Sequence, residues 1–198
     1  MHFSLLFLAS TALASPLLNV HLERRDLATI QSAFTAVGNA LTTFDNSVTP
    51  LSTSADVTNN LDTLVSQAGS IVDALNSGTT SVSGTSAVGL TDALSLVSAA
   101  NNLVSITNTT VNDLITKHDI IDQAGATATV EQQLANEKAA AQSFIAAVVG
   151  KVPSAVQSIA AQQAQAVIDA LNRGITAFGG SAKRAVGFGE GMGEGVGI

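Results

Sequence analysis

The 198-residue sequence contains no cysteine, no tryptophan and no tyrosine. Without cysteine the chain cannot form disulfide bonds, so the packing of apolar side chains must hold its fold together. Phenylalanine is the only aromatic residue type present, which is a poor composition for stacking on sugar rings. These absences exclude a disulfide scaffold and argue against an aromatic carbohydrate-binding site.

Charged residues are also scarce, at 12% of the chain, and 15 acidic residues outnumber 8 basic ones. Binding to nucleic acid requires clustered Lys and Arg side chains that neutralise phosphates. We therefore expect no nucleic-acid partner. No stretch is long and apolar enough to span a bilayer, and the glycine-rich C-terminus does not fit a lipid-anchor signal.

The first 14 residues have the pattern of a secretory signal peptide. Residues 3–8 are nearly all apolar, and Ala12 and Ala14 supply the small residues that precede a cleavage point. The alternative, a buried N-terminal helix, lacks a helix-capping residue before the apolar run. We therefore expect cleavage after Ala14 and a secreted protein.

Two dibasic pairs indicate further processing. Arg24-Arg25 lies between the signal peptide and the first helical pattern, so residues 15–25 are expected to form a propeptide that is cut after Arg25. Two ordinary solvated arginines are the alternative. Lys183-Arg184 precedes a tail with glycine at every second position from 187 to 197, where backbone entropy opposes a regular helix. Residues 181–198 are therefore expected to be flexible or removed after Arg184, which leaves 26–180 as one helical domain.

Apolar residues recur at helical spacing between these ends. The clearest segment runs from Asp26 to Thr49, where the spacing alternates between three and four residues; its apolar positions are Leu27, Ile30, Phe34, Val37, Leu41, Phe44 and Val48. Four more helices are expected, over residues 54–78, 91–117, 129–149 and 153–179, with a capping box at 129–132 and stops at Gly78 and at Gly179-Gly180. Residues 79–86, almost entirely Ser, Thr and Gly, are expected to form a flexible loop open to O-glycosylation. The predicted fold is all-α, a single bundle of about five amphipathic helices without disulfides.

Sequence patterns for chemistry are weak. The sequon Asn108-Thr-Thr110 predicts N-glycosylation of a solvent-facing Asn108, with an unused sequon as the alternative. His118-Asp119 with a distant serine would form a hydrolase triad, but no Gly-x-Ser-x-Gly accompanies it, so a solvated cluster with Lys117 is favoured. With no thiol, no tight carboxylate cluster and no phosphate-binding loop, we expect no enzyme activity, no metal and no cofactor.

The order of these features resembles the fungal hydrophobic surface binding protein A family, which includes cell wall galactomannoproteins. The resemblance covers residues 26–179, and its closest stretches are Leu114-Ile-Thr-Lys117, the Gly125 junction, Val130–Leu134, Val148–Pro153 and the ending Ile168–Gly179 with Ile175-Thr-Ala-Phe178. It implies a secreted helical domain, extracellular or in the cell wall, that binds hydrophobic surfaces or fatty-acid chains. It also implies a secreted polyester hydrolase as a partner of some members. A structural wall mannoprotein without a specific ligand is the second interpretation, and a small secreted hydrolase is the last.

A fatty acid would need an apolar channel between the helices. The apolar faces of the predicted helices offer these residues to line such a channel: Phe44, Leu61, Leu64, Ile71, Leu94, Val97, Val104 and Phe144. Ser or Thr hydroxyls are expected at its mouth, because the folded region holds few cations, namely Lys117, Lys138, Lys151 and Arg173. Adsorption by an opened bundle, which needs no cavity, remains the alternative mode of binding.

Overall fold

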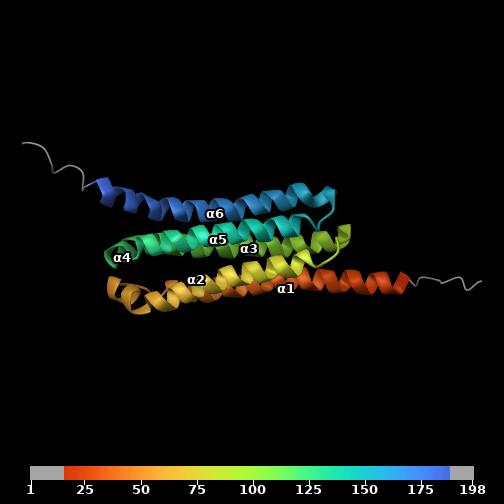
Figure 1. Ribbon diagram of the computed structural model, residues 1–198, viewed down its shortest axis with the longest axis horizontal. Helices are drawn as coiled ribbons and strands as arrows, with labels where there is room; N and C mark the ends of the chain where they lie inside the picture. The colour runs from red at the N-terminus through yellow and green to blue at the C-terminus, as the bar shows by residue number, and fades with distance from the viewer. Residues whose placement is uncertain (1–15, 188–198) are drawn as a thin grey trace, which may run out of the picture.

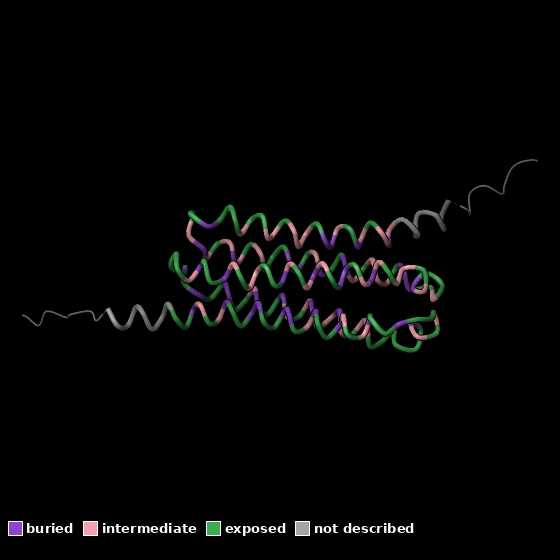
Figure 2. Tube along the Cα trace, turned by 180° about the vertical axis from the view of Figure 1, so that it is seen from behind, coloured by how far each residue is buried: buried purple, intermediate pink, exposed green. Residues whose placement is uncertain are grey.

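The stripe of apolar residues predicted along the first helix, here called its seam, forms and faces the interior of the protein. The computed structural model describes residues 16–187, with side chains described for residues 24–179. Six seam positions of α1 (Pro16–Val48) are buried: Ile30, Phe34, Val37, Leu41, Phe44 and Val48. Alternating spacings of three and four place these residues on one stripe of the helix. Figure 2 shows such buried stripes on the inner sides of the long helices.

The described residues form six helices and no strand, as Figure 1 shows. Besides α1 these are α2 (Ser54–Ser83), α3 (Leu90–Thr116), α4 (His118–Gln123), α5 (Thr127–Val149) and α6 (Ser154–Gly187). Five are long and run roughly side by side, while the short α4 lies in the turn between α3 and α5. The predicted all-α bundle of about five long helices is confirmed. No helix in the described part of the chain is long and apolar enough to cross a membrane.

The five long helices pack in a closed ring. Going round the ring, α1 contacts α2, α2 contacts α5, α5 contacts α6, α6 contacts α3, and α3 returns to α1. Each helix therefore has two main neighbours and turns its apolar stripe toward a common axis. A ring of five helices leaves more space on its axis than a pair or a four-helix bundle, unless large side chains fill it.

Lysine side chains and a buried aspartate hold the connections between helices. Lys117 Nζ donates to the carbonyl oxygen of Leu51 at 2.6 Å, and Lys151 Nζ donates to the carbonyls of Ser83 and Thr85. The carboxylate of Asp26, which is 3% exposed, accepts from the Ser86 backbone N–H at 3.0 Å. These contacts satisfy carbonyl and amide groups at helix ends that would otherwise lack partners.

The predicted stop of the second helix at Gly78 is wrong. Helix α2 continues to Ser83, so only residues 84–89 connect it to α3, and most of the expected 79–86 loop is helical. Gly78 is buried inside the helix, and a Cβ there would lie 2.9 Å from Cε2 of Phe144. The glycine is therefore explained by the close approach of a phenyl ring rather than by a helix end.

Three other predicted boundaries also differ. Helix α1 begins at Pro16, ahead of Asp26, and α6 continues through Gly179-Gly180 to Gly187. Helix α5 begins at Thr127 after Gly125, whose φ of 70° reverses the chain, so Thr129–Gln132 lies within the helix and is no cap. A capping box does form elsewhere, where the Thr53 hydroxyl accepts from the Asp56 N–H and the Asp56 carboxylate accepts from the Thr53 N–H.

Candidate functional site

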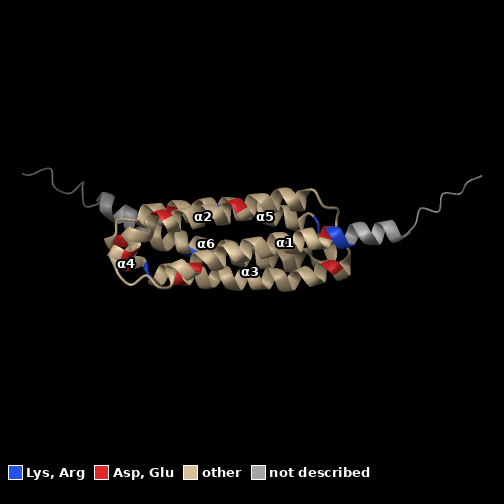
Figure 3. Ribbon diagram, turned by 90° about the horizontal axis from the view of Figure 1, so that it is seen from below, with Lys and Arg blue, Asp and Glu red and all other residues tan. Residues whose placement is uncertain are grey.

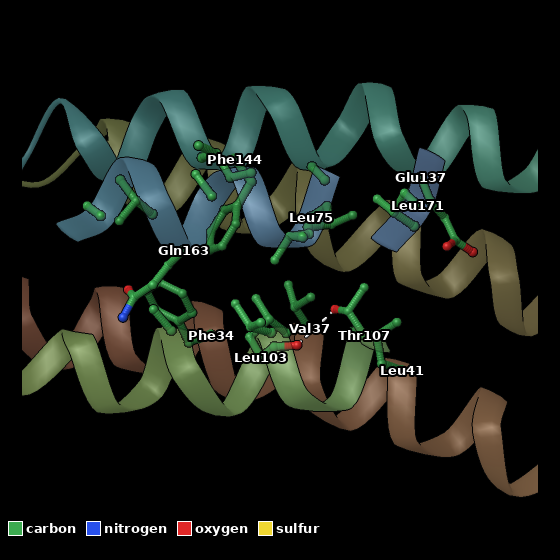
Figure 4. Close-up of a pocket in the computed structure, with 18 of the residues that line it drawn as sticks. Phe34, Val37, Leu41, Leu75, Leu103, Thr107, Glu137, Phe144, Gln163 and Leu171 are labelled. Atoms are coloured by element: carbon green, nitrogen blue, oxygen red, sulfur yellow. Dashed lines mark hydrogen bonds between the residues drawn. The ribbon is translucent and has the colours of Figure 1, made fainter. Parts of the chain in front are cut away.

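An apolar cavity of about 80 Å³, here named the central cavity, lies on the axis of the bundle and is bordered by all five long helices. Figure 4 shows the inward side chains of these helices facing one another around it. Helices α1 and α2 contribute Phe34, Val37, Leu41, Ile71 and Leu75, and α3 contributes Ala100, Leu103, Val104 and Thr107. Helix α5 contributes Glu137, Ala141, Phe144, Ile145, Val148 and Val149, and α6 contributes Ala160, Gln163, Ala164, Val167 and Leu171. Four of these positions are alanines, whose short side chains leave the space open.

A smaller apolar cavity of about 40 Å³, here named the end cavity, lies toward α4. It is bordered by residues of α1, α2, α3, α4, α5 and the connecting turns, among them Phe44, Leu51, Val57, Leu114, Ile121 and Ala126. One residue borders both cavities, and that residue is Glu137.

Glu137 is a carboxyl group buried in an apolar interior. Its side chain is 5% exposed, and no hydrogen bond or ion pair joins it to another residue of the described chain. Burial raises the pKa of Glu137 to about 8, because the ionised form is poorly solvated there. At neutral pH the group is therefore mainly a neutral carboxylic acid, which can both donate and accept a hydrogen bond.

The sequence analysis missed Glu137, although its spacing carried a signal. Val130, Leu134, Ala141, Phe144 and Val148 form the apolar seam of α5, and Glu137 stands three residues after Leu134 and four before Ala141. A glutamate in register with an apolar seam must be buried if the helix packs on that seam. Glu137 belongs to no cluster of chemical groups, so its position among apolar residues is the only signal of it in the sequence.

Two neutral polar side chains also border the central cavity. The Thr107 hydroxyl donates to the Leu103 carbonyl oxygen at 2.8 Å within α3, which leaves its oxygen able to accept. Gln163 Nε2 donates to Asn101 Oδ1 at 2.9 Å and to the Val97 carbonyl oxygen at 3.4 Å, joining α6 to α3. The cavity is thus mainly apolar with polar groups at a few separate points, an arrangement typical of sites for amphiphilic small molecules.

An aromatic pair packs across the central cavity from opposite sides of the ring. Phe34 of α1 and Phe144 of α5 lie edge to face, with their ring centroids 5.4 Å apart. Helices α1 and α5 are not neighbours in the ring, so this pair joins two helices across the axis. Their rings therefore limit the width of the central cavity.

Most of the predicted lining residues border a cavity, but not all. Ile71, Val104 and Phe144 border the central cavity, while Phe44, Leu61 and Leu64 border the end cavity. Leu94 and Val97 border neither, and Leu94 was also wrongly expected to be buried, since it is 53% exposed. Helix α3 buries the neighbouring seam instead, through Ala93, Leu96, Leu103, Thr107, Thr110 and Leu114. Two apolar seams lie close together on this helix, and only its packing selects between them.

The cations and the predicted chemical residues lie away from both cavities. Lys117 and Lys151 bind backbone carbonyls, and Arg173 donates to Asn108 Oδ1 at 2.7 Å. His118 borders neither cavity, and its ring packs against Phe178 with centroids 5.1 Å apart. Figure 3 shows long uncharged stretches along the helices, with most of the charged residues toward the ends of the bundle. No group of three His, Cys, Asp or Glu residues that could hold a metal occurs in the described part of the chain.

The predicted modification sites lie within helices or outside the described residues. Asn108 is half-buried in α3, where its Nδ2 donates to the Val104 carbonyl oxygen at 2.9 Å. Arg25 is exposed within α1, and the next residue, Asp26, is buried. Ala14 lies outside the described residues, and Arg184 lies in the last turns of α6, beyond the described side chains. Glycosylation and cleavage at these sites remain predictions.

Comparisons with known proteins agree on one family and one fold. The sequence model of the family described as hydrophobic surface binding protein A matches residues 27–150. Cell wall mannoprotein 1 of Aspergillus fumigatus is 29% identical over 108 residues, which make up 54% of this chain and 38% of that protein, so the chain spans well under half the length of this relative.

Two solved structures have a similar fold. Ligand-binding domain 1 of the Penicillium marneffei MP1 protein, complexed with arachidonic acids, is 27% identical to this chain, with a TM-score of 0.73 over 77% of this chain and 98% of that domain. The AFMP4P protein in complex with palmitic acid has a TM-score of 0.71 over 77% of this chain and 99% of that one, at 18% identity. At that identity the second likeness shows the fold alone.

Proposed function

Because the chain belongs to the hydrophobic surface binding protein A family, we propose that it binds long-chain fatty acids inside its helical ring without chemical turnover. The observation that carries this proposal is the central cavity, which is apolar, lies on the bundle axis and is bordered by every long helix. The related domain complexed with arachidonic acids has the same fold at 27% identity and supports a fatty acid as the ligand class. The relative named as a cell wall mannoprotein supports an extracellular or cell-wall location.

The size of the central cavity implies that the helices move when a ligand binds. Sites for small organic ligands usually enclose about 300–1,000 Å³, whereas the central cavity encloses about 80 Å³. A long acyl chain therefore fits only if the ring widens. The N-terminal half of α6 is the least buried wall, because Ala160, Gln163, Ala164 and Val167 are only half-buried although they border the cavity.

A titration tests the proposed function. The full chain is titrated with palmitic acid below its micelle threshold and followed by calorimetry. We expect saturable binding of one or two molecules per chain at micromolar affinity, since each buried methylene contributes about 0.8 kcal/mol before the costs of association are subtracted. Strong adsorption to wax or polyester particles without saturable binding to monomeric ligand would contradict a cavity site.

If the ring widens at the α3–α6 contact, linking these two helices should slow the binding of a fatty acid. Because the chain contains no cysteine, two introduced cysteines would be the only thiols available for such a link. In the variant Asn101→Cys/Gln163→Cys, a short bis-methanethiosulfonate reagent would join the two helices at the position of their hydrogen bond. We expect the association rate of palmitic acid to fall at least about tenfold and to recover after reduction, because the ring can no longer open there. Each single-cysteine variant treated with the same reagent is the control. An unchanged rate in the linked protein would place the opening elsewhere.

Adsorption to hydrophobic surfaces is the second candidate function. Three large apolar residues are exposed in the described chain, namely Leu90 and Leu94 on α3 and Ile159 on α6. Helices α3 and α6 are neighbours, and Gln163 contacts Asn101 between them, so these residues belong to adjoining segments at the same end of the bundle. Exposed leucine and isoleucine side chains support contact with an apolar surface near the wall that is expected to open.

We also propose that the mature domain begins at Asp26 and that the segment after Arg184 is removed. The Arg24-Arg25 pair lies inside α1, so a protease would have to unwind the first turns of that helix before cutting. Asp26 itself is held by the Ser86 N–H, which supports a structured start of the mature chain at this residue.

A further inference from the structure

Glu137 stands out because its burial is costly and nothing in the described protein compensates for it. Burying a carboxyl group without a hydrogen-bonding partner destabilises a fold, and burying an ionised one destabilises it far more. Most of its neighbours around the two cavities are apolar, none of the few polar ones bonds to it, and it occupies the one position that borders both. In Figure 4 its carboxyl group lies at one end of the central cavity, beside Leu171 and across from Thr107 and Leu41.

We propose that Glu137 is the anchor for the polar end of the ligand: it binds the carboxyl group of a fatty acid inside the bundle, and the acyl chain runs from there along the central cavity. This inference rests on the proposed function. It differs from a polar mouth at the protein surface, because the head group is held at the boundary between the two cavities. Glu137 lacks a hydrogen-bonding partner in this mainly apolar interior, and the ligand's carboxyl group needs one, so each group would satisfy the other.

The dimensions of α5 favour an acyl chain in the central cavity. The residues of α5 that border this cavity extend from Glu137 to Val149, which at 1.5 Å per residue is about 18 Å of helix. That length suits an extended long acyl chain with its head at Glu137 and its end near Val149. The end cavity, which is half the volume of the central one, lies on the other side of Glu137 and therefore next to the head group rather than at the end of the acyl chain.

The hydrogen bond needs a single proton shared by two carboxyl groups. At neutral pH the free fatty acid is ionised, while burial keeps Glu137 protonated, so the neutral acid donates to the ligand's carboxylate. Two carboxyl groups in contact cannot both be ionised without strong repulsion. Above about pH 8 the free protein loses the proton of Glu137 and must take one up to bind, so the affinity falls tenfold per pH unit.

No other titratable group faces Glu137. The remaining residues that border the two cavities, from α1, α2, α3, α4, α6 and α5 itself, include no Asp, Glu, Lys, Arg or His. Their polar members are Thr107, Gln163, Thr129 and Gln133, which do not titrate. Lys138 follows Glu137 in the sequence but borders neither cavity. The pH dependence above neutrality is therefore assigned to Glu137 alone.

The test compares the full chain with three variants, using palmitic acid and its methyl ester as probes. Glu137→Leu removes the hydrogen-bonding group, Glu137→Gln keeps a neutral donor and acceptor, and Glu131→Gln changes a glutamate of the same helix that borders neither cavity. We expect Glu137→Leu to weaken palmitic acid binding at pH 7 by roughly ten- to a hundredfold and to weaken methyl palmitate binding several-fold less, because a neutral ester carbonyl accepts a weaker hydrogen bond from protonated Glu137 than a carboxylate does. Glu137→Gln is expected to bind palmitic acid within a few-fold of wild type.

The pH profile separates an anchor from a residue that only shapes the cavity. Wild type and Glu131→Gln should bind palmitic acid with a constant Kd from pH 6 to 7.5, and their affinity should fall tenfold per pH unit above about pH 8. The affinity of Glu137→Gln should not change up to pH 9. Equal palmitic acid affinities of wild type and Glu137→Leu at pH 7 would overturn the anchor and leave the proposed function intact. Failure of wild type to bind palmitic acid at all would instead overturn the proposed function.

Discussion

Glu137→Gln is expected to raise the free energy of unfolding at pH 7 by about 3 kcal/mol. The ordinary pKa of a glutamate is 4.5, and burial raises that of Glu137 to about 8. Between these values the folded protein keeps a proton that the unfolded chain releases, so raising the pH favours unfolding. The wild type therefore loses stability from about pH 4.5 to pH 8, and the neutral glutamine removes this loss.

Urea unfolding at pH 4.5, 6, 7 and 8 measures the effect. Wild type and Glu137→Gln should have similar stabilities at pH 4.5 and diverge steadily up to pH 8, with Glu131→Gln following the wild type. A wild type as stable as Glu137→Gln at pH 8 would mean that the carboxyl group reaches water or a partner when ionised. A residue that lowers stability and improves ligand binding is a familiar compromise at functional sites.

Phe34→Asp is expected to lower the free energy of unfolding by about 5 kcal/mol. Phe34 is buried on the seam of α1 and packs edge to face on Phe144, which belongs to a helix on the other side of the ring. The substitution removes this contact, leaves space on the bundle axis and buries a charge that has no cation near the cavity. A loss of this size is comparable to the whole stability of many domains, so the variant is expected to be partly unfolded at 25 °C.

Leu94→Asp is the matched control for this change. It also replaces an apolar residue with aspartate in the middle of a helical apolar pattern, but Leu94 is exposed. Its unfolding free energy should stay within about 0.5 kcal/mol of wild type in thermal or urea unfolding. A large loss at Leu94, or none at Phe34, would mean that the two helices present other faces to the interior.

The proposed widening of the cavity is compatible with a firm core. Seam residues such as Ile30, Ile71 and Phe178 are almost fully buried and hold neighbouring helices together. The axis itself is bordered by alanines on α3, α5 and α6, which fill little of it. Widening the ring at one contact therefore enlarges the cavity without exposing most of the core.

The sequence by itself determined the five long helices, although not their ends or the short α4. Apolar spacings of three and four, seen from Leu27 to Val48, force one face of each segment into the interior, and that is a local property of the chain. The absence of cysteine, the scarcity of charge and the lack of clustered chemical groups likewise follow from composition alone. These features predicted the all-α bundle, whereas the apolar ligand class was implied only by the resemblance to the family.

Only the tertiary structure decided which seam faces the axis and where the polar group lies. Helix α3 has two apolar seams one or two residues apart, and packing against α1 and α6 buries Leu96 and Leu103 while leaving Leu94 in solvent. In the sequence Gly78 predicts the end of a helix, but in the structure it lies within α2, where the ring of Phe144 packs closely against it. The burial of Glu137 depends on residues far apart in the chain, because five helices close around it, and this burial is what raises its pKa.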